Sequence, residues 1–515
     1  MKKIFLRVLS CALMVTLLLS LATMGVSVLA EETPKTDLAI TGITWNGGNQ
    51  PKPGKAITFT VKITNKGAEI AKGTSVPLWL YMDGKVLFSE TYDKGFAAGQ
   101  TTEVTLPKWK ATAGDHVVTA VINSNAIAAK SSWDSGLHYT THIRVGEKAL
   151  AVPEIAQTYG MDTLVFSDDF KTLDTIDVDC TGGYGYKWYT QRPYGAKDML
   201  PTDYVLTENG VRLQQEIPSF NWGFCTLDPK TGVGWGYQFG YLEVRLKVAA
   251  NRVIPDTKGS PAVWSFPPEK VLNDFDDGPH TWVEMDWMEY WGNNKFTTCF
   301  HDSLFVESQE TCRIDNTNIS AFGLGDEQWH TMGFLWRDGT LECFLDGEEY
   351  MSQYWSGEEK PYPDAFVKTG EGEYTTDGAF ESMDSRLLSL ILGSGKGWPM
   401  EIDYITVWQG DAEASKGEST QTAMFMDCYL RDSDGQINTA VNFERYETLL
   451  MIEESLTELP AEQQAEINRV VKRKSGKTLS EVLEDAKQFK DSLEQFIAQY
   501  ATDSEGNILS AENID

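Results

Sequence analysis

The chain has 515 residues and a net charge of −31 at pH 7, with 75 acidic residues against 44 Lys and Arg. This length predicts about three domains. The negative charge argues against nucleic acid or anionic lipid as a partner, and it suits a protein that acts on neutral ligands.

Residues 1–30 predict a secretory signal peptide. Three basic residues precede an apolar run that ends in the small-residue pattern VLA at 28–30, as signal peptides do. No later stretch is apolar for long enough to span a bilayer. We therefore expect an exported protein, secreted or held at the cell surface, without membrane insertion.

Residues 33–147 predict an antiparallel β-sandwich of immunoglobulin size. Alternating runs such as ITFTVKITN and VPLWLYMDG are separated by turn-forming stretches such as NGGNQPKPG, a spacing typical of such sandwiches. In DLAITGITW, PKPGKAITFTVKITNKG and VVTAVINSN the segment resembles the CARDB-type adhesion-related modules of exported bacterial proteins. The resemblance implies a spacer or a binding accessory, and no catalytic cluster lies here.

Residues 160–410 predict a larger antiparallel sandwich of two sheets. Strand patterns such as GYLEVRLKV and MEIDYITVWQ recur with many Trp and Tyr residues and almost no helical periodicity. Residues 411–423 form a polar linker. In residues 424–515 apolar side chains recur every three to four positions, which predicts a small module of three helices with no assignable role.

The cysteines beyond residue 30 contain no CxxC pair, so their spacing does not resemble a zinc site. Export permits disulfides. The order of the sequence suggests a bond between Cys299 and Cys312 across one loop, and isolated buried thiols are the alternative.

The stretch WVEMDWMEY at 282–290 holds three carboxylates. Glu284 and Asp286 share a face of a regular strand, whereas Glu289 points away from them. One extra residue accommodated as a β-bulge near Trp287 and Met288 would return Glu289 to the same face. A catalytic role therefore requires a bulge, with Met285 and Trp287 packed into the interior.

With the bulge, the two glutamates can lean towards each other across Asp286. A separation of roughly 5 to 5.5 Å suits a retaining glycosidase, in which one carboxylate attacks the anomeric carbon and the other protonates the leaving oxygen. The aspartate can orient the nucleophile, and crowded like charges raise the pKa of the carboxyl that must stay protonated.

The motifs YQFGYLEVRLKV, PAVWSF, VEMDWMEYWGN, QWHTMGFLWRDGTLECFLDG and GWPMEIDYITVWQ follow one another along the chain. In this order the region resembles glycoside hydrolase family 16, in its laminarinase-like branch that contains the bulge. The resemblance implies a concanavalin-like β-jelly roll with a concave cleft and hydrolysis with retention. It makes Glu284 the nucleophile, Asp286 its assisting acid and Glu289 the general acid/base.

The resemblance also suggests residues around these acids. His301 matches a histidine that hydrogen-bonds the sugar or the acid/base, with a packing histidine as the alternative. Trp264 and Trp398 match tryptophans near the cleft, where indoles stack on sugar rings. Trp188, in a loop rich in Gly and Tyr, could form a cleft wall. Sandwich cores also use tryptophan.

No cofactor is expected for catalysis. The family often holds a structural calcium, for which Asp169 and Asp403 occupy matching places, although two carboxylates alone do not make such a site.

We predict a mainly β protein that is an exported, monomeric, retaining endo-β-glycosidase with a polysaccharide substrate, foremost a β-1,3- or β-1,3-1,4-glucan. The alternatives are endo-β-galactosidase action on galactan or host O-glycan chains, transglycosylation, and noncatalytic carbohydrate binding or adhesion.

Overall fold

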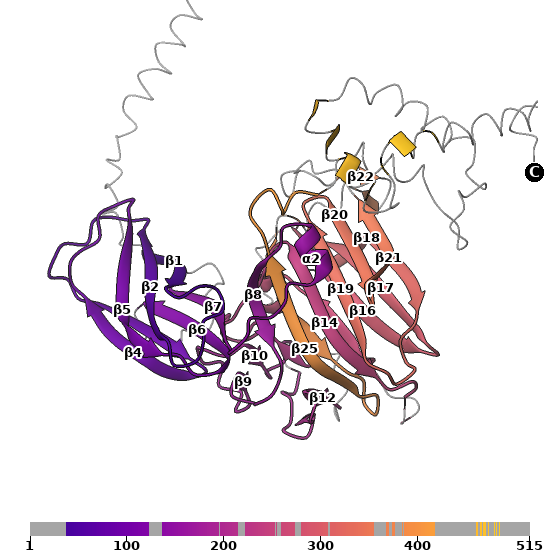
Figure 1. The fold of residues 1–515 in the computed structure, drawn as a ribbon, viewed down its shortest axis with the longest axis horizontal. Coiled ribbons are helices and arrows are strands. Elements are labelled where there is room, and N and C mark those ends of the chain that lie inside the picture. Colours follow the sequence, from indigo (N-terminus) through magenta and orange to yellow (C-terminus); the bar gives the residue numbers. More distant parts are fainter. Residues whose placement is uncertain are drawn as a thin grey trace, which may run out of the picture.

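The protein contains two β-sandwich units in succession (Figure 1). A computed structural model describes residues 38–122, 136–194, 196–214, 222–252, 254, 259–272, 280–306, 309–354, 367–369, 373–375, 384, 386–417 and scattered positions between 460 and 484. The predicted signal peptide, residues 418–423 of the predicted linker and most of the predicted helical module lie outside these residues. Within the described part, no helix is long and apolar enough to cross a membrane.

The first unit is the predicted immunoglobulin-sized sandwich. It is built from β1 (Leu38–Trp45), β2 (Ala56–Asn65), β3 (Val76–Met82), β4 (Lys85–Tyr92), β5 (Thr101–Lys110), β6 (Gly114–Ile122) and β7 (His138–Val145). One antiparallel sheet has the order β1-β2-β5 and the other β4-β3-β6-β7. Alternate residues of β2 from Ile57 to Ile63 are buried, because successive side chains of a strand point to opposite faces.

The second unit is the predicted two-sheet jelly-roll sandwich. Its elements are α2 (Glu154–Thr158), β8 (Thr163–Asp168), β9 (Ile176–Asp177), β10 (Trp188–Tyr189), β11 (Tyr204–Leu206), β12 (Val211–Leu213), β13 (Phe224–Cys225), β14 (Gly240–Val248), β15 (Ala262–Ser265), α3 (Pro268–Leu272), β16 (His280–Gly292), β17 (Lys295–Val306), β18 (Gln309–Phe322), β19 (His330–Arg337), β20 (Thr340–Leu345), β21 (Glu348–Tyr354), β22 (Val367–Thr369), β23 (Glu373–Thr375), β24 (Ile391–Gly393) and β25 (Met400–Gln409).

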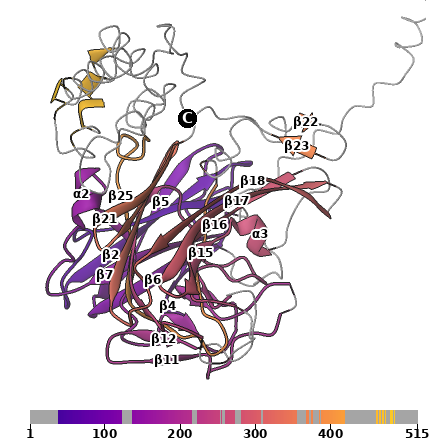
Figure 2. The same ribbon diagram turned by 90° about the vertical axis from the view of Figure 1, so that its right-hand side faces the viewer.

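One sheet has the order β18-β17-β16-β15-β24-β13-β10-β9, and the other has the order β11-β12-β25-β14-β19-β20-β21 with β8 beside β25. Figure 2 shows β15 to β18 side by side, with α3 next to them. The core lies between the two sheets: the Trp287 ring of β16 is 5.5 Å from the Phe334 ring of β19. Packing in this core therefore holds the Trp287 side chain in place.

The two units pack against each other where β7 meets β8 (Figure 1). Asp115 of β6 accepts a hydrogen bond from the Ser167 hydroxyl and pairs with Arg144. His142 of β7 meets the stacked rings of Phe166 and Trp235 edge to face, at 4.6 and 5.2 Å. Burial lowers the pKa of His142 well below its ordinary value, so the imidazole is neutral at physiological pH and packs as an aromatic ring.

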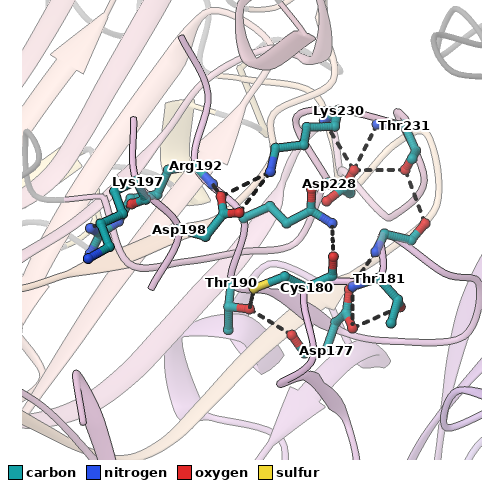
Figure 3. A network of polar contacts seen from close by, with 12 residues as sticks. Asp177, Cys180, Thr181, Thr190, Arg192, Lys197, Asp198, Asp228, Lys230 and Thr231 are labelled. Carbon is teal, nitrogen blue, oxygen red and sulfur yellow. Dashed lines mark hydrogen bonds and ion pairs between the residues drawn. The ribbon is translucent and has the colours of Figure 1, made fainter. Parts of the chain in front are cut away.

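A network of polar contacts fixes the β9–β10 edge of the larger sandwich (Figure 3). The Asp177 carboxylate accepts hydrogen bonds from the Thr181 backbone N–H and hydroxyl, at 3.0 and 2.9 Å. The Cys180 sulfur lies 3.2 Å from the Thr190 hydroxyl oxygen. These bonds satisfy the polar groups of a short strand edge, as a sheet edge requires.

Trp188 is part of the core, so its predicted place in a cleft wall is wrong. Its side chain has 0% exposure, stacks on Phe170 at 5.7 Å and donates from Nε1 to Asp168 Oδ2 at 2.9 Å. The surrounding loop is rich in Gly and Tyr, but the indole points inward and satisfies a buried carboxylate. No surface remains on which a sugar ring could stack.

Candidate active site

The predicted bulge is present between Asp286 and Glu289. Across the β16–β17 pair, Asp286 is opposite Cys299 and Glu289 is opposite Thr297. Three steps along β16 therefore match two steps along β17, which is one extra residue on β16. Residues directly opposite each other share a face of the sheet, so the extra residue changes the face on which Glu289 lies.

The bulge sends its own side chains inward. Trp287 and Met288 are consecutive, yet both are fully buried in the core together with Met285. The predicted interior positions of Met285 and Trp287 are thereby confirmed. The Thr298 hydroxyl donates to the Trp287 carbonyl oxygen at 2.8 Å, which gives a hydrogen-bond partner to a backbone group at the irregular position.

The carboxylates lie on the opposite face from these core side chains. Glu284 is directly opposite His301, and the Asp286 Oδ2 atom lies 3.1 Å from His301 Nε2. Glu289 is opposite Ala262 of β15. The structure thus brings the three predicted acids and the predicted histidine together on two neighbouring strands.

Burial raises the pKa values of both glutamates. Burial, followed by the negative charge of Asp286, raises the pKa of Glu284 to about 8, and His301 opposes this shift. Burial also raises the pKa of Glu289, and His301 again opposes the shift. A cluster of this kind holds at least one proton near neutral pH, so it combines protonated and ionised carboxyls as general acid catalysis requires.

Trp264 lies on the same face as these acids. It packs in a cluster with Ala262, which is directly opposite Glu289, and its ring meets the Trp222 ring at 5.2 Å. Trp264 is buried by such neighbours, so the described residues leave little of its ring open.

Trp398 belongs to the core and not to a sugar-binding surface. Its side chain is 4% exposed, its ring lies 5.5 Å from the Tyr290 ring, and its Nε1 donates to the Ala249 carbonyl oxygen at 2.9 Å. The prediction that Trp398 contacts substrate does not fit this position, because the indole packs on the interior side of β16.

Trp291 is an exposed aromatic residue that the sequence did not single out. Its side chain is 51% exposed, and its Nε1 donates to the Thr297 hydroxyl at 2.8 Å. Because Thr297 is opposite Glu289, this bond holds the indole beside Glu289. Trp291 follows Glu289 by two residues, so alternation beyond the bulge places both side chains on one face of the strand.

Lys270 and Tyr194 also lie near the acids. The Lys270 ammonium is 5.7 Å from the centre of the Tyr194 ring, and the Tyr194 hydroxyl donates to the Lys270 carbonyl oxygen. Lys270 lowers the pKa of Glu284, although burial outweighs it. Lys270 does not stand out in the sequence.

The suggested disulfide between Cys299 and Cys312 is absent, because Cys299 is a thiol. Within the β17–β18 pair, Cys299 is opposite Asn318 and Cys312 is opposite Leu304. The two cysteines are therefore several residue pairs apart along the ladder, beyond the reach of a disulfide.

Asp169 and Asp403, the predicted calcium ligands, line one cavity of about 310 Å³. Each carboxylate is paired with basic side chains: Asp169 with Arg144 at 3.5 Å, and Asp403 with Lys171 at 3.8 Å and with Arg245. Asp169 also forms a group of three carboxylates with Asp115 and Asp168, whose ligand oxygens lie within 4.8 Å of one another. Calcium binding therefore stays a prediction.

Residues 35–132 match the CARDB family model. This match confirms the resemblance predicted for the N-terminal unit. The match ends before β7, which completes the four-stranded sheet. A comparison with curated proteins finds no match.

Solved structures resemble about half of the chain at low identity. One is from work on endo-acting O-glycanases that human gut microbiota express to initiate mucin breakdown: it is 16% identical, with 52% of this chain and 95% of that chain covered and a TM-score of 0.33. A GlcNAcα1-4Gal-releasing endo-β-galactosidase from Clostridium perfringens is 17% identical, with 53% of this chain and 66% of that chain covered and a TM-score of 0.34. A laminarinase from Flavobacterium sp. UMI-01 is 15% identical, with 48% of this chain and 100% of that chain covered and a TM-score of 0.30.

The raised pKa of Glu284 predicts that this residue destabilises the fold at alkaline pH. An unfolded glutamate has a pKa of about 4.3, so the folded state binds this proton more tightly and loses stability as pH rises from about 4.3 towards 8. Glu284→Gln should therefore raise the melting temperature more at pH 8 than at pH 4.5. Each kcal/mol gained in the free energy of unfolding should raise the melting temperature by about 2–4 °C.

Melting curves of wild type and variant at the two pH values measure this difference. Glu208→Gln, at an exposed position of the same unit, is the control and should show no such trend. An equal change at both pH values for Glu284→Gln would contradict the raised pKa.

Proposed function

We propose that the larger unit is a retaining endo-β-glycosidase. The observation that carries this proposal is the register shift between Asp286 and Glu289, which puts three acids and His301 on one face of the sheet. Glu284 and Glu289 have raised pKa values because of burial. Paired carboxyls that divide the acid and the nucleophile roles are the machinery of retaining glycosidases.

In the proposed reaction, the ionised Glu284 carboxylate attacks the anomeric carbon while Glu289 gives its proton to the leaving glycosidic oxygen. The glycosyl–enzyme ester is then hydrolysed by water, from which Glu289 removes the proton. Glu289 ends protonated and Glu284 is released as a carboxylate, so the protons balance over the cycle.

Asp286 acts in this scheme as a positioning residue. Its Oδ2 atom lies 3.1 Å from His301 Nε2. The charge of Asp286 raises the pKa of Glu284, whereas His301 lowers the pKa of both glutamates. The histidine therefore sets the charge balance between nucleophile and acid. His301 and Lys270 oppose the rise in the pKa of Glu284, so they increase the fraction of Glu284 that is ionised and able to attack.

The proposed substrate is a neutral β-linked polysaccharide, foremost a β-1,3- or β-1,3-1,4-glucan. The charge of −31 disfavours polyanionic chains, because like charges repel. Galactan or host O-glycan chains are the alternative substrates. The predicted signal peptide supports export, and the CARDB unit, packed on the larger unit through β7 and β8, would hold the enzyme as an accessory module.

Reducing-sugar release from β-glucans, galactans and mucin-type glycans tests this function. Wild type and Glu208→Gln should hydrolyse at least one of them, whereas Glu284→Gln and Glu289→Gln should lose at least about 10²-fold in kcat. Glu289→Gln should lose less kcat on an aryl glycoside with an acidic leaving group, because such a group departs without being protonated. Binding of glycans by all four proteins without hydrolysis by any would contradict the proposal.

Trp291 should bind a sugar ring, whereas Trp188 should hold the fold. Trp291→Ala should raise KM about 2- to 10-fold, because an aromatic contact contributes about 0.5–1.5 kcal/mol, and it should leave the melting temperature nearly unchanged. Trp188→Ala should cost about 3–5 kcal/mol of stability. Kinetics and melting curves of the matched pair check this, and an unchanged KM for Trp291→Ala would refute the stacking role.

A further inference from the structure

Three different ligand atoms converge beside the proposed catalytic acids. The Cys299 sulfur lies 3.0 Å from His301 Nε2, and Asp286 Oδ2 lies 3.1 Å from the same nitrogen. All three atoms are within 4.8 Å of one another. A thiol, an imidazole nitrogen and a carboxylate oxygen are the donors that zinc takes in proteins.

The geometry distinguishes a metal site from a catalytic triad. In a nucleophilic triad the thiol and the carboxylate use opposite nitrogens of the imidazole. Here both use Nε2, and the other nitrogen, Nδ1, is farther from the sulfur at 3.8 Å. Donors that meet at one point suit a cation at that point and cannot relay a proton through the ring.

The separations are close to those of a tetrahedral zinc site. Zinc bond lengths imply roughly 3.3 Å between nitrogen and oxygen ligands and roughly 3.6 Å between nitrogen and sulfur ligands. The observed 3.1 and 3.0 Å require the side chains to move apart by a few tenths of an ångström. Rotation of the His301 ring and of the Cys299 side chain provides this.

The scaffold fixes the three donors. Asp286 and Cys299 are directly opposite each other on β16 and β17, and His301 follows Cys299 by two residues on the same face. As whole residues, Asp286, Cys299 and His301 are 5%, 2% and 8% exposed. Donors held on paired strands in a largely dry site lose little freedom when they bind a metal.

We propose that Cys299, His301 and Asp286 form a binding site for a zinc-like divalent cation, and that the bound cation blocks hydrolysis. Binding releases the thiol proton to solvent. The His301 proton resides on Nδ1, so that Nε2 gives its lone pair to the cation, and the contact between Asp286 Oδ2 and Nε2 is replaced by bonds from both atoms to the cation. With three protein ligands, one position stays open beside Glu284, which is opposite His301. The blocking of hydrolysis rests on the proposed function, whereas the binding does not.

Co²⁺ and Zn²⁺, added to the reduced full-length protein, test the site. Wild type should bind one equivalent and give the near-ultraviolet thiolate-to-Co²⁺ band. Cys180→Ala is the matched control, because Cys180 lies at the other edge of the sheet in the network of Figure 3, and it should behave as wild type. Cys299→Ala and Cys299→Ser should lose the band and bind Zn²⁺ more than about tenfold more weakly.

The absence of stoichiometric binding by wild type would overturn the site, as would a thiolate band of equal strength in the folded Cys299 variants. Zn²⁺ should inhibit glycan hydrolysis by wild type and Cys180→Ala reversibly with EDTA, and it should inhibit Cys299→Ser less. Equal inhibition of all three would overturn the blocking role. If no protein hydrolyses any glycan without metal, the proposed function fails, and the Co²⁺ band still decides the metal site.

Discussion

The site depends on one extra residue in β16. Regular alternation would place Glu289 on the core face, where an unpaired carboxylate would be costly. The bulge instead buries both Trp287 and Met288 and turns Glu289 to the face of Glu284. The burial of two large apolar side chains and the Thr298 bond to the Trp287 carbonyl stabilise a conformation that the isolated strand would not favour.

The extra residue in β16 also increases the repulsion between the acids, because it brings their carboxyl groups together. Burial raises the pKa of Glu284, and the repulsion between acids that are brought together on β16 adds to this rise. His301 opposes part of this rise in the pKa of Glu284. Its Nε2 atom meets Asp286 on one side and the Cys299 sulfur on the other, so one imidazole serves the charge balance of the acids and completes a set of metal donors. In our account, catalysis and metal inhibition compete for this ring.

The spacing of the acids made a bulge the condition for a catalytic role, because E-x-D-x-x-E can lie on one face of a strand only with an extra residue. The order of the surrounding motifs, which resembles a family with this bulge, then favoured it. The strand patterns likewise predicted both sandwiches. Tryptophans were harder to place, since a loop rich in Gly and Tyr does not show that Trp188 points inward to Asp168. The donor set also escaped prediction: Cys299 and His301 meet Asp286 across strands, whereas sequence motifs for zinc depend on spacing along the chain.

The central claim is that Glu284 and Glu289 share a face and act as nucleophile and acid. Proton NMR of the first product released by wild type tests it most directly, because double displacement preserves the anomeric configuration. Our account predicts that the β-anomer appears first and then mutarotates. Initial release of the α-anomer would mean a single displacement by water and would contradict the assignment of Glu284 as the nucleophile.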